Sequence, residues 1–202
     1  MIIRCFAGLF AVLMVISGAV AEDRLPEPEL SDSGLHVQPW FHDGFLELAD
    51  DLSEAAESGK DLLILVEQPG CPYCRELHHV NLRIPKIADY MRDNYLVVQL
   101  DMRGSREAAD LDGTAMEERD LVRRWGVTFT PTLLFVPAEA AEAGGTVRDH
   151  AAMTMPGYFK PFHFETMLHF VASDAYAGGD FQRYLDQRAA DLREKGEEVD
   201  IW

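Results

Sequence analysis

The sequence predicts a single α/β domain built around a mixed β-sheet. Three observations support this: short apolar runs of strand length, amphipathic stretches of helical spacing between them, and Pro or Gly residues where one pattern replaces the other. A chain of 202 residues is long enough for one domain with a sizeable core and short for two. Alternating strand and helix signals are typical of the α/β class.

The first 21 residues resemble an export signal. Arg4 precedes an apolar run that ends in small residues at Ala19 to Ala21, as a signal peptidase requires. The alternative is an uncleaved anchor, but the apolar run is shorter than about 20 residues and an acidic, Pro-rich segment follows it. We therefore expect a cleaved signal peptide over 1–21, a periplasmic location and no stable membrane insertion. Residues 22–40 are expected to form a flexible acidic arm.

The following segments alternate between helix and strand. Apolar residues at helical spacing over 41–57 predict an extra N-terminal helix, and the continuous apolar run 61–67 predicts a strand buried on both faces. Pro72 suits the first turn of a helix through residue 82, and Pro85 kinks that helix or starts another through Asn94. Residues 95–102 predict a second strand.

The second half of the chain continues the pattern. Residues 103–118 are too rich in Gly and Asp for one regular element throughout. The Asp-x-Asp-Gly pattern that begins at Asp110 is similar to the start of a calcium loop, but Ala115 and Met116 stand where oxygen ligands are needed, so a solvated loop is expected. A short helix is predicted before Gly126, a third strand over 130–137 and a hairpin strand over 148–155. Two more helices are expected over 160–176 and 180–196. The main domain is thus predicted over 41–176, with a C-terminal helical extension over 177–202.

The charge balance restricts the possible partners. The formal net charge is −17, so the surface repels phosphate backbones and anionic lipid. We therefore expect no nucleic-acid partner.

Two cysteines remain once the expected signal, with Cys5, is removed. A crosslink between Cys71 and Cys74 would hardly restrict the unfolded chain, so a purely structural disulfide is disfavoured. A metal site normally needs four ligands, and His78 or His79 could supply only a third. No resident metal is expected, although a copper-binding chaperone that uses the two cysteines stays open.

The position of the pair favours redox chemistry. Cys71 follows a predicted strand and a Pro-Gly turn and stands at the start of a helix, where free N–H groups stabilise a thiolate. Cys74 lies one turn later and can reach back to it. We therefore expect Cys71 to attack a substrate disulfide and Cys74 to resolve the mixed disulfide, with no bound cofactor.

The segments GCPYC (70–74) and WGVTFTPTLLF (125–135), with the predicted element order, resemble the thioredoxin superfamily over about 41–171. The sequence is most similar to exported bacterial thioredoxins associated with sulfur-oxidation (Sox) clusters. The resemblance implies a thioredoxin fold, with a central mixed sheet flanked by helices. It also implies that Pro131 is cis beside the dithiol and that Thr130 presents its backbone to a substrate segment. Tyr73 and Pro72 are candidate substrate contacts.

The sequence departs from the thioredoxin pattern near the cysteines. Gly70 replaces the tryptophan that precedes the first cysteine, and Leu65 stands where thioredoxins bury a proton-relaying aspartate. Glu67, two residues later on the same strand face, is a candidate proton acceptor for Cys74. The alternative is a solvated glutamate at the strand end.

These observations lead to one functional expectation: a periplasmic thiol–disulfide oxidoreductase that reduces disulfides of partner proteins. The resemblance further implies recharging by a membrane thiol-electron donor. A disulfide oxidase or isomerase is the alternative within the same class, and the copper-binding chaperone is the alternative from another class.

Overall fold

The computed structural model describes residues 24–197 and residue 199. The expected signal peptide over 1–21 lies outside these residues. Within the described part of the chain, no helix is long and apolar enough to cross a membrane.

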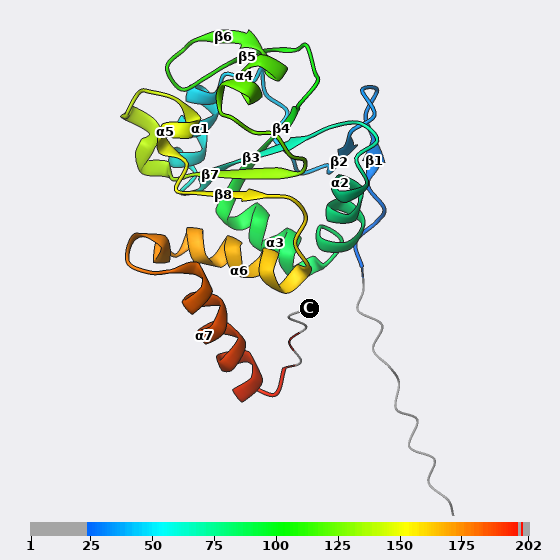
Figure 1. Cartoon of the computed structure of the whole chain (residues 1–202), viewed down its shortest axis with the longest axis vertical. Coiled ribbons are helices and arrows are strands. Elements are labelled where there is room, and N and C mark those ends of the chain that lie inside the picture. The colour runs from blue at the N-terminus through cyan, green and yellow to red at the C-terminus, as the bar shows by residue number, and fades with distance from the viewer. Residues whose placement is uncertain (1–23, 198, 200–202) are drawn as a thin grey trace, which may run out of the picture.

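A four-stranded mixed sheet forms the centre of the domain, with strand order β4-β3-β7-β8 (Figure 1). The strands are β3 (Asp61–Glu67), β4 (Tyr95–Asp101), β7 (Thr132–Val136) and β8 (Met153–Pro156). β3 pairs with β4 in parallel, whereas β3–β7 and β7–β8 are antiparallel. The predicted α/β class with a mixed sheet is confirmed.

Helices cover both faces of the sheet (Figure 1). One core cluster lies under α1 (Leu48–Glu57), α4 (Glu118–Arg124) and α5 (Val147–His150). The other lies under α3 (Pro85–Asn94) and α6 (Pro161–Ala172) and also receives Leu77 from η1 (Leu77–Asn81), a π-helix that continues α2 (Pro72–Glu76). Two short 3-10 helices also occur, η2 (Ala138–Glu142) and η3 (Ala175–Ala177).

Strand β3 supplies both clusters because successive side chains of a strand point to opposite faces. Leu62 and Ile64 belong to the first cluster, and Leu63 and Leu65 belong to the second. The same alternation directs Glu67, the last residue of β3, to the face that carries α2 and η1.

Two predicted elements differ from the structure. Helix α1 begins at Leu48 rather than near residue 41, because Leu46 takes a left-handed conformation (φ 60°) and Phe45 is 92% exposed. The start of the predicted strand 148–155 is instead helix α5. Thr146 and Asp149 form a reciprocal capping box there, which stabilises a helix start, and the strand β8 begins only at Met153.

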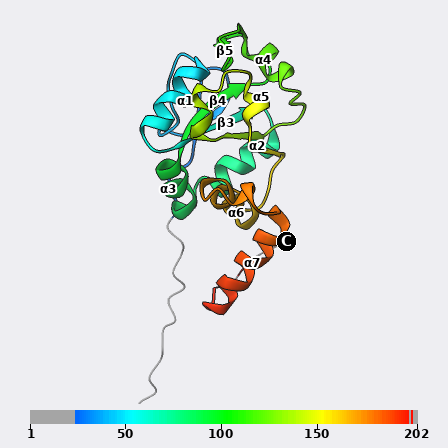
Figure 2. The same cartoon turned by 90° about the vertical axis from the view of Figure 1, so that its left-hand side faces the viewer.

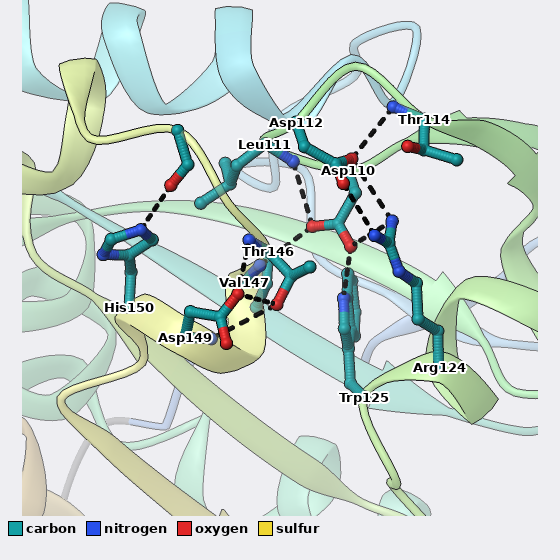
Figure 3. A network of polar contacts seen from close by, with 11 residues as sticks. Asp110, Leu111, Asp112, Thr114, Arg124, Trp125, Thr146, Val147, Asp149 and His150 are labelled. Carbon is teal, nitrogen blue, oxygen red and sulfur yellow. Dashed lines mark hydrogen bonds and ion pairs between the residues drawn. The ribbon is translucent and has the colours of Figure 1, made fainter.

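The predicted solvated loop contains a short hairpin of β5 (Glu107–Ala109) and β6 (Ala115–Glu117). Asp110 follows β5 and is fully buried, so the solvated interpretation is wrong at this residue. Its Oδ1 accepts hydrogen bonds from the backbone N–H groups of Leu111 (2.9 Å) and Val147 (2.8 Å). Its Oδ2 accepts from Trp125 Nε1 (2.9 Å) and Arg124 Nη1 (3.1 Å), so one carboxylate joins the hairpin to α4 and α5 (Figure 3).

Residues 24–40 differ from the expected flexible arm. They form a hairpin of β1 (Glu29–Leu30) and β2 (His36–Val37) that lies beside the α2 end of the domain (Figure 1). Leu25 N–H donates to Arg83 O (2.9 Å), and Gln99 Nε2 on β4 donates to His36 O (2.7 Å). The arm is therefore hydrogen-bonded to the domain.

The C-terminal extension is α7 (Phe181–Glu194), which lies beyond α6 on the side away from the sheet (Figures 1 and 2). Phe181 and Tyr184 contact Phe170, with ring centroids 5.4 and 5.1 Å apart. Arg188 on α7 donates to Glu165 on α6 (2.9 Å). Aromatic packing and an ion pair thus hold the extension to the domain.

His169, on α6, makes the free energy of unfolding depend on pH. Its ring stacks on Tyr90 (centroids 3.8 Å apart), and burial together with the positive charge of Arg188 lowers its pKa to about 4. The unfolded chain therefore binds the proton more tightly than the folded one between about pH 6.5 and 4, so stability falls as the pH falls through this range. We expect His169→Gln to reduce this loss by about 1 kcal/mol in urea unfolding at pH 4.5 compared with pH 7. Equal pH dependence in both proteins would contradict the prediction.

Candidate functional site

The two cysteines lie where β3 passes into α2. Gly70 has φ +72°, a conformation that side chains strain, and turns the chain from the strand into the helix. Cys71 is the N-cap residue of α2, and Pro72 occupies the first turn, where no N–H is needed. Cys71 and Cys74 form a disulfide, with their Cα atoms 5.3 Å apart.

The backbone at this helix start is oriented toward the Cys71 sulfur. The N–H of Cys74 donates to Cys71 Sγ (3.1 Å). In the reduced protein the same N–H stabilises a thiolate on Cys71, as a capping interaction and through the helix dipole. Both cysteines are buried residues, Cys71 at 6% and Cys74 at 3% exposed, so it is the N–H donated to Cys71 Sγ that distinguishes the two sulfurs.

The fold brings residues 130 and 131 beside the disulfide. The Thr130–Pro131 peptide bond is cis, as the resemblance implied. Thr130 Oγ1 donates to Cys71 Sγ (3.4 Å), and Thr130 O lies 3.5 Å from the same sulfur. The loop before β7 therefore forms one wall of the site.

Two large side chains near the disulfide are exposed. Tyr73, between the cysteines, is 60% exposed, and Phe129, directly before Thr130, is 67% exposed. Pro72 is exposed as well. The sequence interpretation named Tyr73 and Pro72 but missed Phe129, which its position next to the Thr-Pro pair could have indicated.

Glu67, the last residue of β3, is buried, so its interpretation as a solvated glutamate is wrong. It is 1% exposed. Its Oε2 accepts hydrogen bonds from Gln99 Nε2 (2.5 Å) and pairs with His78 Nε2 (3.0 Å). Its Oε1 is buried without a hydrogen-bond partner. The end of β3, four residues before Cys71, thus holds a buried carboxyl group with one unpartnered oxygen.

His78 also contacts the N-terminal arm. The ring is fully buried, and its Nδ1 lies 3.3 Å from Nε2 of Gln38. The sequence interpretation considered His78 only as a metal ligand and missed Gln38. The spacing of four residues between Cys74 and His78 was the signal in the sequence that places His78 on the same side of the helix as Cys74.

Three histidines gather around η1. The His36 ring lies 5.6 Å from the His78 ring and 5.2 Å from the His79 ring. Burial, with the neighbouring His78 as a smaller cause, lowers the pKa of His36. Among residues 24–197 and 199, no three His, Cys, Asp or Glu side chains are arranged to hold a metal ion.

Comparisons with known proteins support the predicted fold. A family model described as a thioredoxin-like domain matches residues 48–172. A thioredoxin-fold protein from Helicobacter pylori aligns with 75% of this chain and 95% of its own, at 16% identity and a TM-score of 0.50. A thioredoxin from Thermus thermophilus aligns with 66% of this chain and 90% of its own, at 21% identity and a TM-score of 0.50. No curated protein matches the sequence. The predicted thioredoxin fold, with its flanking helices, is confirmed.

Proposed function

Because the chain belongs to the thioredoxin-like domain family, we propose that it is a thiol–disulfide oxidoreductase that reduces disulfides of partner proteins. One observation carries this proposal: the Cys71–Cys74 disulfide lies at a helix start against the cis Thr130–Pro131 bond. This arrangement combines a stabilised thiolate with an adjacent backbone segment for a substrate.

The reaction takes two exchange steps. In the reduced protein, the Cys71 thiolate attacks one sulfur of a partner disulfide and releases the other as a thiolate, leaving a mixed disulfide. Cys74 then loses its proton to Glu67 and attacks Cys71 Sγ, which frees the second partner thiol. The protein ends with the Cys71–Cys74 disulfide, and the partner has gained two electrons.

The surface around Cys71 suits an extended protein segment. The backbone of Thr130 can pair with such a segment as an added strand would. Tyr73, between the cysteines, and Phe129, directly before Thr130, are exposed aromatic side chains, and the exposed Pro72 directly follows Cys71. We propose that these residues contact the partner protein around its disulfide.

The cellular role follows from the sequence features. The predicted export signal over 1–21 supports a periplasmic protein, and the resemblance to the Sox-associated thioredoxins supports a reductant. Its partners would be exported proteins whose thiols must stay reduced, and a membrane thiol-electron donor would recharge it.

The redox potential tests the direction of electron flow. The purified protein without residues 1–21 is equilibrated with glutathione buffers, and the Cys71–Cys74 disulfide is quantified by alkylation. We expect a potential near −270 mV, as for reductant thioredoxins. A value near −120 mV would instead identify an oxidant that donates its disulfide.

Glu67→Gln tests the proton acceptor. Reduced protein is mixed with an aromatic disulfide whose thiol product absorbs light, so that attack by Cys71 and resolution by Cys74 each release one thiol. We expect the second release to slow by roughly 100-fold at pH 7, because general base catalysis is lost, while the first release is unchanged. Equal rates of the second release in both proteins would rule out this role for Glu67.

A further inference from the structure

A chain of buried polar groups connects the N-terminal arm to the active-site strand. Gln38 follows β2, His78 lies in η1, Glu67 ends β3 and Gln99 lies on β4. Gln38 Nε2 is 3.3 Å from His78 Nδ1, and His78 Nε2 is 3.0 Å from Glu67 Oε2. Side chains from η1 and β4 thus bond to the Glu67 carboxyl group at the end of β3, and the N-terminal arm is linked to it through His78.

The chain of groups lies on the same side of the helix as the resolving cysteine. Cys74 and His78 are four residues apart on the continuous α2–η1 helix, where such residues are neighbours. Both are buried, whereas Arg75 and Glu76 between them are exposed. The π-helical widening begins at Leu77, and such widenings are frequent at functional sites.

The hydrogen bonds define which atoms carry protons. The amide nitrogen of Gln38 can only donate, so Nδ1 of His78 accepts and its ring proton lies on Nε2. Nε2 therefore donates to Glu67 Oε2, which also accepts from Gln99. Oε2 is saturated, and the buried, unpartnered Oε1 is left as the oxygen that can take a proton.

We propose that His78 is a positioning residue for the resolving step: it holds Glu67 so that Oε1 receives the proton of Cys74. This inference rests on the proposed function. The Cys74 S–H bond breaks as Oε1 takes the proton, the Cys74 thiolate bonds to Cys71 Sγ, and the bond from Cys71 to the partner sulfur breaks. The partner leaves as a thiolate and takes a proton from water, and Glu67 returns its proton to solvent.

Other titratable and charged groups lie on the elements next to His78 and Glu67. They are Arg75 on α2, His79 on η1, His36 on β2, Asp101 on β4 and, in the arm, Glu27, which pairs with His79. His79 is a matched control for His78 because it is the adjacent histidine but pairs with Glu27 and not with Glu67.

The test is the pH profile of the second thiol release in the assay described for Glu67. We expect His78→Phe to slow this release about tenfold at pH 6.5, because the Glu67 carboxylate loses the hydrogen bond that His78 Nε2 donates to it. The difference in this rate between His78→Phe and the unsubstituted protein should disappear toward about pH 9.5, where the Cys74 thiol ionises without a general base. His78→Gln should recover most of the rate, since its amide can still donate to Glu67. The first release should be unchanged in both variants.

Three comparisons can overturn the inference. His79→Gln should leave both releases unchanged, and Glu67→Gln combined with His78→Phe should be no slower than Glu67→Gln alone, because His78 acts through Glu67. The inference is overturned if the double variant is slower than Glu67→Gln alone. It is also overturned if His78→Phe slows the second release equally at every pH, or does not slow it at all. If His78→Phe does not fold, Gln38→Leu replaces it, with about a threefold slowing expected and no slowing overturning the inference. A wild-type protein without the first release would refute the proposed function instead.

Discussion

Cys71→Ser is expected to lose disulfide reduction by at least about 1,000-fold, because the thiolate that attacks the partner is removed. Cys74→Ser is expected to keep the attack but to accumulate the mixed disulfide, because the sulfur that resolves it is missing. The N–H of Cys74 that donates to Cys71 Sγ belongs to the backbone and survives this substitution. The measurement is recovery of covalent protein adducts that dissociate with a reductant.

The two variants control each other. A protein with both substitutions should trap nothing, and Cys71→Ser alone should trap nothing above that background. Adducts on Cys71→Ser but not on Cys74→Ser would reverse the assigned roles and would show that the N–H donated to Cys71 Sγ does not mark the attacking sulfur.

Asp110→Asn is expected to lower the free energy of unfolding by about 3 kcal/mol. The buried carboxylate accepts four hydrogen bonds, among them those of Val147 N–H and Trp125 Nε1 (Figure 3). The asparagine side chain replaces one acceptor oxygen by an NH2 group, which is a donor. This NH2 group would face N–H donors of the network, so buried donors would be left without an acceptor. Urea unfolding followed by tryptophan fluorescence measures the loss.

The control for this prediction is Asp112→Asn in the same loop. Asp112 binds Arg124 but is partly exposed, so we expect a far smaller shift of the unfolding midpoint. The Asp110 network joins α4 and α5, which pack on the core cluster on the other face of the sheet from η1. The folded Asp110→Asn protein should therefore retain the first thiol release of Cys71. Equal destabilisation by both substitutions would show that loop charge, and not the buried network, determines stability.

Much of the fold was predictable because it rests on local features. The apolar run of β3 matches the predicted strand at both ends, and Pro85 begins α3 as its position allowed. The elements that differed depend on interactions that a short window does not contain. Helix α1 begins late because Leu46 turns left-handed, and a capping box at Thr146 converts the start of a predicted strand into α5.

The candidate site was predictable to a smaller extent. The cysteines and the Thr-Pro pair are recognisable as motifs, and Thr130 does lie within hydrogen-bond reach of Cys71. The burial of Glu67 was not predictable, because the end of a strand can equally face solvent. Its burial depends on partners from other segments, His78 and Gln99.

The sequence by itself therefore determined the alternation of strands and helices, the dithiol and its place at a helix start, because each depends on side-chain period or on neighbours within a few residues. Only the tertiary structure decided that the arm is docked, that Asp110 and Glu67 are buried, and that His78 joins Glu67 to Gln38. Burying a polar group is unfavourable unless partners are present, and these partners are supplied by residues distant in the chain.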